Sequence, residues 1–143
     1  MLLIIPFSID HLRKLKPQKD QKVIYNYMME NSDCLNMLEN NSYCAYTFYD
    51  DRKNKIIGCS GIMNMNDGIG YCWSLFSNDM KYHFKELIGI IRKYLKKAKF
   101  DELQSVCENR FPESMRWMKL IGFKENITYE VDNIKYTSYT RQP

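Results

Sequence analysis

The stretch from Ile69 to Phe123 constrains the fold more than any other part of the chain. It contains a strand pattern at Ile69–Leu75, a helical pattern at Met80–Lys99 and a second strand pattern at Leu103–Glu108. Two strands joined by a crossover of helix length form a parallel pair with a right-handed connection. The sequence therefore predicts an α/β sheet with this unit at its centre.

The long helix of this unit has one apolar face. Its apolar residues recur at intervals of three and four, which is typical of a helix packed on a sheet; they are Phe84, Leu87, Ile88, Ile91 and Leu95. A turn at Phe76–Asp79 precedes the helix, and Asn78 or Asp79 can cap it, because a short polar side chain accepts from the free N–H groups of the first turn. We expect Leu87, Ile88, Ile91 and Leu95 to be buried.

A second, shorter helix is predicted over Pro112–Ile121. Proline suits the first turn, which needs no N–H donor there, and Gly122 supplies the left-handed residue that ends the helix. Phe123 can then fold back onto the last turn, and we expect Trp117 or Met118 to be buried.

The composition indicates one domain over residues 1–143. The formal charge of +4, from 21 basic and 17 acidic residues, permits an anionic partner without requiring one. Five cysteines without close pairs favour reduced thiols, and with only two histidines no metal site is expected. Met1–Ile5 is too short and too poor in basic residues for a signal peptide or membrane span, so we expect a cytoplasmic protein.

The remaining segments complete a mixed sheet. A strand at Leu2–Pro6 is followed by a short helix capped by Ser8 and a helix at Gln21–Glu30, whose apolar stripe is Val23, Ile24, Tyr27 and Met28. Strands at Tyr43–Tyr49, Ile56–Met65 and Ile69–Leu75 form a meander with a hairpin turn at Asn66-Asp67-Gly68, and Gly58 and Gly61 indicate close backbone approach. Strands at Lys124–Val131 and Lys135–Thr140 flank a turn at Asp132-Asn133, which gives the order β-α-α-β-β-β-α-β-α-β-β.

This order resembles the fold of the GNAT acetyltransferases, in which a mixed sheet is splayed between two parallel strands so that acyl-CoA enters the gap. The matching residues are Asn109, after the second parallel strand, and Ser114–Phe123, a helix that ends in Gly-Phe. The resemblance implies an acyl-CoA-dependent N-acyltransferase that uses acetyl-CoA and no metal, with an unknown amine or protein as acceptor. The implied cofactor-binding residues are Trp73, Ser74, Leu75, Phe76 and Asn109.

Two features depart from that family. Its pyrophosphate loop is rich in glycine, because bare amides at a helix N-terminus must surround the phosphates, whereas Ser77–Phe84 contains no glycine. Many members also carry a tyrosine that protonates the departing CoA thiolate, and Met118 occupies that position. We therefore expect weak binding of acetyl-CoA.

A narrower resemblance accommodates these departures. The residues from Cys72-Trp73 through the basic helix Lys85–Lys97 to Asn109, Ser114 and Ile121-Gly122 resemble a small GNAT-like family of short-tailed bacteriophages, named for its internal virion protein. That family also lacks the glycine loop. Membership would imply the host cytoplasm or the virion as the location, and a phage or host protein as the partner.

The other candidate residues each have a plain structural alternative. Glu108 and Glu102 could act as general base or be solvated, and Asn109 could bind a ligand or cap the next helix. Trp73 and Tyr71 could line a cleft or belong to the core. His83 and Cys107 could form a nucleophile–base pair, although nothing in their spacing brings them together. A basic face could meet phosphates, although a solvated surface is favoured; its residues are Lys81, Lys85, Arg92, Lys96 and Lys99.

Three functions follow from these residues. The first is an acetyltransferase that moves an acyl group from acyl-CoA to an amine. The second is a noncatalytic GNAT-fold phage protein that serves virion morphogenesis or binds a protein partner. The third and least favoured is a nucleic-acid binder that uses the basic helix.

Overall fold

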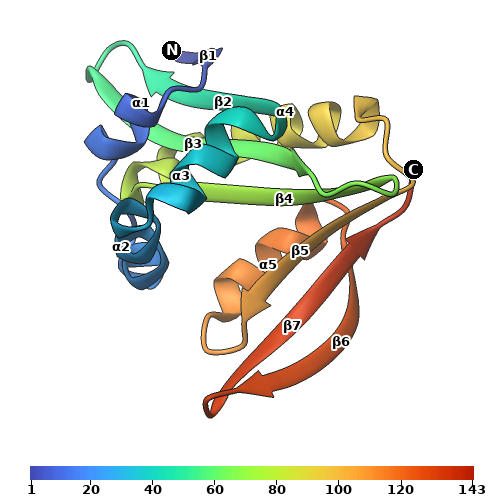
Figure 1. Ribbon diagram of the computed structural model, residues 1–143. Coiled ribbons are helices and arrows are strands. Elements are labelled where there is room, and N and C mark those ends of the chain that lie inside the picture. Colours follow the sequence, from blue (N-terminus) through green and yellow to red (C-terminus); the bar gives the residue numbers. More distant parts are fainter. The chain divides into compact units, whose positions relative to one another are not determined.

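The computed structural model describes residues 1–143 and contains one seven-stranded sheet with the strand order β1-β2-β3-β4-β5-β7-β6 (Figure 1). The strands are β1 (Leu2–Pro6), β2 (Ser42–Asp50), β3 (Lys55–Asn64), β4 (Ile69–Phe76), β5 (Glu102–Glu108), β6 (Lys124–Val131) and β7 (Ile134–Arg141). The helices are α1 (Ile9–Lys14), α2 (Lys22–Glu30), α3 (Ser32–Asn40), α4 (Phe84–Lys97) and α5 (Pro112–Leu120), with short 3-10 helices η1 (Lys19–Gln21) and η2 (Asn78–His83). None of the helices is long and apolar enough to cross a membrane.

The predicted parallel pair is present. β4 and β5 run parallel, with Ile69–Tyr71 in register with Glu102–Gln104. The next strand in the sheet, β7, is antiparallel to β5 and pairs along its length from Leu103 to Glu108. The α/β fold class inferred from the sequence is therefore confirmed.

The long helix begins later than predicted. The segment Asn78–His83 forms the 3-10 helix η2, and regular α-helix begins only at Phe84. The cap is also different: Ser77, and not Asn78 or Asp79, accepts a hydrogen bond at its side chain, from the backbone N–H of Asp79 at 3.2 Å. A 3-10 turn results because Met80 N–H donates to the carbonyl of Ser77, three residues earlier.

A helix absent from the predicted order lies between the first two strands. Asn31 ends α2, and its side chain then accepts from the backbone N–H of Cys34, which caps α3. One residue thus separates two helices, because asparagine favours the cap position over the helix interior. The predicted order contained two helices here, and the structure has three besides η1.

The chain groups into two compact units, and the prediction of a single domain stays a prediction. The first unit contains Met1–Asn64 and Cys72–Phe84. Figure 1 shows α1, α2 and α3 together on one side of its strands. Its buried core cluster combines residues of these helices with residues of β3 and β4, namely Leu12, Leu15, Met28, Leu38, Cys59 and Leu75.

The predicted apolar stripe of α2 is wrong in part. Met28 is buried, but Val23, Ile24 and Tyr27 are 79%, 55% and 63% exposed. The helix instead turns Tyr25 and Met29 toward the core cluster beside Met28. The hydroxyl of Tyr25 donates to the carbonyl of Leu12 in α1 at 2.7 Å, which fixes this rotation of the helix.

The second unit contains Met65–Tyr71 and Lys85–Pro143. Leu87, Ile91 and Leu95 of α4 are buried as predicted, whereas Ile88 is half-buried. The C-terminal parts of this unit are tied together by arginines: Arg92 donates to the carbonyl of Leu120 at 2.6 Å, and Arg141 donates to that of Leu95 at 3.5 Å.

The end of α5 follows the prediction. Gly122 has a φ of +97°, and Phe123 N–H donates to the carbonyl of Met118 at 3.0 Å, which is the Schellman arrangement. Met118 and Phe123 are both buried, whereas Trp117 is half-buried. The predicted turns at Asn66-Asp67-Gly68 and Asp132-Asn133 also have the expected left-handed backbone.

Gly58 shows why a glycine is required in β3. A Cβ atom at this position would lie 2.3 Å from the ring of Phe76, which stacks on Phe48 at a centroid distance of 6.3 Å. Both phenylalanines are buried. Any side chain at Gly58 would therefore displace this aromatic pair.

Replacing Leu87 by alanine should lower the free energy of unfolding by about 2–5 kcal/mol, because the side chain is fully buried and its removal leaves a cavity. Urea denaturation followed by circular dichroism measures the change. Lys93→Ala, at an exposed position of the same helix, is the control and should leave the midpoint almost unchanged. Equal midpoints for Leu87→Ala and the wild type would show that this helix face is wrongly assigned.

Candidate functional site

The C-terminal half of β4 is the part of the chain to which the resemblance assigns acyl-CoA. Ser77 N–H donates to the carbonyl of Ile57 in β3 at 2.8 Å. Because backbone groups of successive strand residues point to opposite edges, those of Phe76 point away from β3. This free edge of β4 is where an extended ligand could add to the strand.

Gln21 already occupies that edge. Its side-chain oxygen accepts from Phe76 N–H at 2.8 Å, and its side-chain nitrogen donates to the carbonyl of Ser74 at 3.0 Å. The primary amide thus binds two strand residues as the peptide group of a neighbouring strand would. The carbonyl of Phe76 is also taken, because Gln18 N–H donates to it at 2.8 Å.

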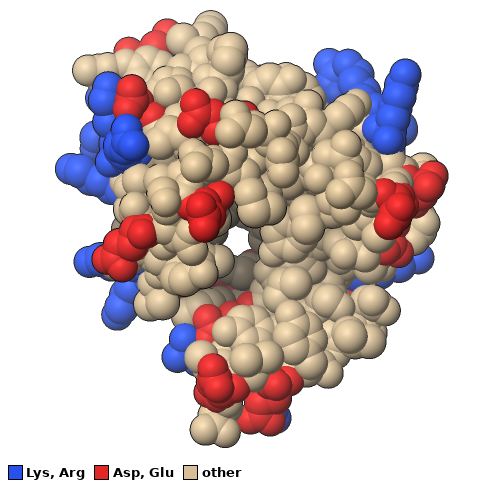
Figure 2. All heavy atoms as spheres, in the orientation of Figure 1, with Lys and Arg blue, Asp and Glu red and all other residues tan.

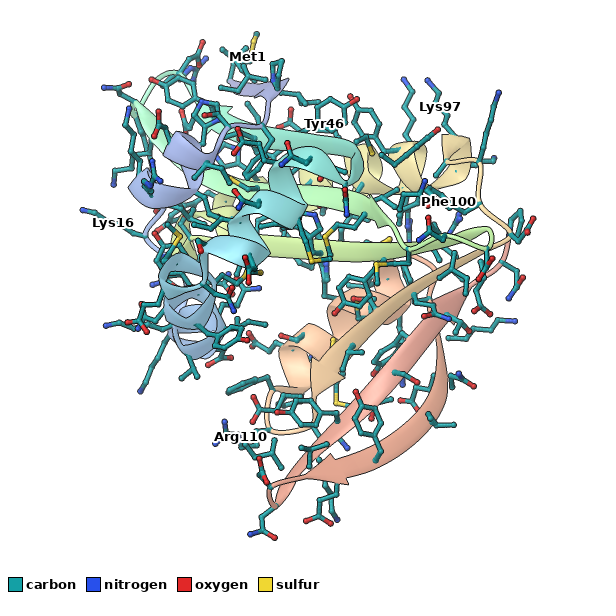
Figure 3. The ribbon with its side chains drawn as sticks, in the orientation of Figure 1. Met1, Lys16, Tyr46, Lys97, Phe100 and Arg110 are labelled. Carbon is teal, nitrogen blue, oxygen red and sulfur yellow. The ribbon has the colours of Figure 1, made fainter.

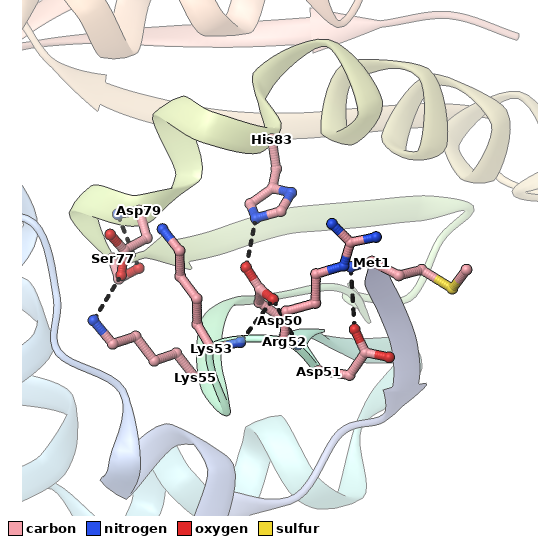
Figure 4. Close-up of polar contacts among 9 residues, drawn as sticks. All are labelled: Met1, Asp50, Asp51, Arg52, Lys53, Lys55, Ser77, Asp79 and His83. Atoms are coloured by element: carbon pink, nitrogen blue, oxygen red, sulfur yellow. Dashed lines mark hydrogen bonds and ion pairs between the residues drawn. The ribbon is translucent and has the colours of Figure 1, made fainter.

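The amides at the start of η2 are occupied in the same way. Asp79 N–H donates to the side chain of Ser77, and Met80 N–H donates to its carbonyl, each at 3.2 Å. The carboxylate of Asp79 lies beside these amides and forms an ion pair with Lys55 at 3.7 Å (Figure 4). A phosphate would have to break both hydrogen bonds and approach a carboxylate.

The residues of β4 and η2 therefore do not fit acyl-CoA in this conformation. A CoA pyrophosphate needs uncommitted amides at a helix N-terminus, and the described amides are committed to Ser77. An extended pantetheine chain needs open strand groups, and Gln18 and Gln21 fill them. Both obstacles come from the chain itself.

Trp73, the other candidate on β4, belongs largely to the core. Its ring meets that of Phe7 edge-on at 5.3 Å and is packed against the core cluster of the first unit. Its indole N–H is buried without a hydrogen-bond partner, close to Gly61, where an added Cβ would lie 2.9 Å from the nitrogen. Leu75 is buried in the same cluster, and Trp73 is half-buried beside it.

Glu108 and Asn109, the candidates at the end of β5, both have structural partners in the second unit. Glu108 forms an ion pair with Arg110. The side chain of Asn109 accepts from the buried hydroxyl of Thr137 at 2.6 Å, and its N–H donates to the carbonyl of Lys135 at 2.8 Å. Asn109 does not cap α5, whose N-cap is Phe111. The asparagine instead holds the β5–α5 turn against β7.

The residues considered for proton or nucleophile chemistry show no catalytic arrangement. Met118 is buried and has no proton to donate. Burial raises the pKa of the Cys107 thiol to about 11, so it is not a nucleophile at neutral pH. His83 is paired with Asp50. No group of three or more His, Cys, Asp or Glu residues could hold a metal ion.

The pair of His83 and Asp50 is the most enclosed ion pair of the first unit. Their side chains are 16% and 6% exposed, with His83 Nε2 at 3.1 Å from Asp50 Oδ2 (Figure 4). The other oxygen of Asp50 accepts from the backbone N–H groups of Arg52 and Lys53 at 3.0 and 3.2 Å. The Lys53 amide is the main cause that holds the pKa of Asp50 below its ordinary value, and His83 acts in the same direction. This pair ties η2 to the β2–β3 turn.

The basic residues named from the sequence do not all lie on one helix. Lys81 lies in η2 and Lys99 lies beyond the end of α4, so they are not on the helix as predicted. Figure 2 shows basic side chains on both sides of the view, among them a group near the end of α4, where Figure 3 labels Lys97, within a surface that is mostly neither basic nor acidic. One exposed aromatic ring has cations nearby: Tyr82 lies 4.6 Å from Lys53 Nζ and 5.2 Å from Lys81 Nζ.

The residues that decide whether a ligand fits were missed in the sequence. Gln18 and Gln21 lie far from β4 along the chain, and nothing in their local pattern indicates which strand they reach. The position of Asp50 gave a partial indication of its role, because an aspartate that begins a polar turn commonly accepts hydrogen bonds from the following amides.

Replacing Asp50 by asparagine should lower the free energy of unfolding at pH 7. The folded-state pKa of Asp50 is depressed, so its stabilising effect is present above the unfolded value of about 3.9 and is lost as the pH falls through the lower folded value. Urea denaturation at pH 7, 5 and 3 should therefore show a difference that shrinks between pH 5 and pH 3. A difference that is the same at all three values would contradict this role of the carboxylate.

The comparisons with known proteins identify the fold. No protein-family model and no curated protein sequence matches the chain. A probable acetyltransferase from Staphylococcus epidermidis superposes with a TM-score of 0.72 at 15% identity, over 99% of this chain and 99% of that one. An N-acetyltransferase from Staphylococcus aureus gives 0.68 at 12% identity, over 99% and 97%. A GNAT-family acetyltransferase from Bacillus anthracis gives 0.67 at 15% identity, over 99% and 94%.

These similarities extend over nearly the whole of this chain and of each of the three solved structures. At such low identity they establish the architecture and leave the chemistry to be argued from the residues. The chain has the fold of the GNAT acetyltransferases.

Proposed function

We propose that this chain is an acetyltransferase-like protein that uses the GNAT fold to bind a protein partner and not to transfer acyl groups efficiently. The observation that carries the proposal is the occupation of the β4 edge by Gln21, which binds Phe76 and Ser74 together. An extended acyl-CoA would need the same groups. The N–H groups of Asp79 and Met80 are likewise bonded to Ser77 and so are not open to a CoA phosphate.

A protein partner suits the exposed surface of α2. Val23, Ile24 and Tyr27 present apolar side chains on adjacent turns, each more than half exposed. Apolar side chains that are exposed side by side can mark a protein interaction site. The resemblance to the internal virion protein family of short-tailed phages supports a role in virion morphogenesis, with a phage or host protein as partner and the host cytoplasm or the virion as location.

Acyl transfer from acetyl-CoA to an amine is the second candidate, and the fold favours it. Solved structures similar to it in architecture are acetyltransferases. For this function Gln18 and Gln21 would have to leave the β4 edge, and η2 would have to release its two amides. Glu108, the candidate general base, would also have to leave Arg110.

Calorimetric titration with acetyl-CoA at sub-millimolar concentration tests the proposal. Each charge-assisted hydrogen bond to a phosphate contributes about 1.5–3 kcal/mol, so the loss of two would move a micromolar site to millimolar or weaker. We therefore expect no measurable heat for the wild type. A micromolar isotherm would overturn the noncatalytic proposal and favour the acetyltransferase.

The variant Gln21→Ala separates the two obstacles. It frees the Phe76 N–H and the Ser74 carbonyl, but leaves the Phe76 carbonyl bonded to Gln18 and the amides of η2 committed to Ser77, so we expect its titration also to show no heat. A micromolar isotherm for this variant alone would show that Gln21 is the whole obstacle, which contradicts the role given to η2. Circular dichroism confirms that the variant is folded.

A further inference from the structure

The last strand but one, β6, is an edge strand with nothing on its outer side within the second unit. It pairs with β7 alone and ends the strand order, and Figure 1 shows it as the outermost strand beside β7. All eight of its residues are exposed. Three of them carry large apolar side chains, Ile127, Tyr129 and Val131, which are 59%, 38% and 51% exposed.

The hairpin fixes which backbone groups of β6 face outward. The two-residue turn Asp132-Asn133 makes Val131 and Ile134 the hydrogen-bonded pair that closes it. Pairs then alternate along an antiparallel ladder, so Glu130 and Lys135 do not exchange hydrogen bonds across it. The Lys135 carbonyl accepts from the Asn109 N–H on the β5 side, so it points away from β6, as this alternation requires. The N–H and C=O groups of Glu130, and of Thr128 two residues earlier, therefore point away from β7.

These outward groups are spaced for a second copy of the same strand. We propose that two chains pair through β6, antiparallel and about a two-fold axis at Tyr129. Thr128 of each chain then faces Glu130 of the other, and both residues offer the outward N–H and C=O that a hydrogen-bonded pair requires. Tyr129 faces Tyr129 of the second copy, and Val131 lies toward Ile127, at the start of the irregular part of the other strand, so exposed apolar side chains meet on both sides of the axis.

The neighbouring registers fit less well. An axis at Glu130 sets the two Glu130 carboxylates opposite each other, which is unfavourable. An axis at Thr128 pairs Val131 with Glu125 and brings both residues of the irregularity, Asn126 and Ile127, into the paired segment, whereas the axis at Tyr129 brings in Ile127 alone. In the Tyr129 register each Glu130 faces a neutral threonine and lies across from Lys135 of its own hairpin. The charges, the outward hydrogen-bonding groups and the apolar contacts thus all favour the axis at Tyr129.

The part of β6 from Thr128 to Val131 has little of the usual protection of an edge, with Glu130 as its one charged residue. Sheet edges commonly avoid pairing by means of proline, inward-pointing charge or bulges. In β6 the only irregularity lies before Thr128, and no proline or lysine occurs from Thr128 to Val131. The central pairs, formed by Thr128, Tyr129 and Glu130, lie in the regular part of the strand, and Ile127 lies in the irregular part.

Disulfide trapping tests the register. At a two-fold axis on a non-hydrogen-bonded pair the two Cα atoms approach to about 4.5 Å, which a disulfide can span. Under mild oxidation Tyr129→Cys should form a covalent dimer, identified by mass spectrometry of the linked peptide. Thr128→Cys, whose position faces Glu130, and the wild type with its five cysteines should not. Linkage of Thr128→Cys without Tyr129→Cys would overturn the proposed alignment.

Light scattering after size exclusion tests the dimer itself. We expect a concentration-dependent dimer for the wild type and a dissociation constant about tenfold or more higher for Val131→Lys, because each lysine would lie toward Ile127 of the other copy, twice in the dimer. Val23→Lys exchanges the same residue type at the exposed surface of α2 and should leave dimerisation unchanged. A wild type that stays monomeric up to several hundred micromolar, or equal weakening by both variants, would overturn the proposal.

Discussion

The need to satisfy the backbone of β4 is the constraint on which the structure depends most. Its first residues, Ile69–Tyr71, are in register with β5, and at its far end Ser77 bonds to Ile57 of β3. Between them the carbonyl of Ser74 and both backbone groups of Phe76 face an edge with no strand partner in the first unit. Leaving buried backbone groups unpaired is costly, and Gln18 and Gln21 supply the missing partners. The segment that leads into α2 is thereby fastened to the sheet.

The parts of the fold that were predictable depend on local chemistry. The hairpin turns at Asn66-Asp67-Gly68 and Asp132-Asn133, the proline at the start of α5 and the glycine after it each specify a backbone conformation from neighbouring residues alone. The parallel pair followed from a crossover of helical length, which few topologies permit. These signals sufficed for the fold class.

The parts that were missed depend on long-range contacts. The Gln21 side chain reaches a strand more than 50 residues later in the chain, and His83 reaches Asp50 in the same manner. The predicted buried face of α2 was wrong because both faces of the helix carry apolar residues. The hydrogen bond from Tyr25 to Leu12 determines which face is buried. The late start of α4 followed from Ser77, whose hydroxyl competes for the amides of the next turn. None of these outcomes is encoded in periodicity.

Under the proposed function, this chain keeps the scaffold of the acetyltransferases without their chemistry. Every device that positions the elements is present: the parallel strands, the crossover helix and the Schellman ending at Gly122. The backbone groups that would bind a cofactor are hydrogen-bonded to side chains instead. The Gln21 amide binds β4 where the amides of a ligand would, and the Ser77 hydroxyl accepts from the Asp79 N–H where a phosphate would. Each filling group completes the hydrogen bonds of the folded chain, so removing it to admit acyl-CoA would cost stability that the ligand would have to supply. A fold stabilised in this way favours use of its outer surfaces, and β6 and α2 are where those surfaces are apolar and open.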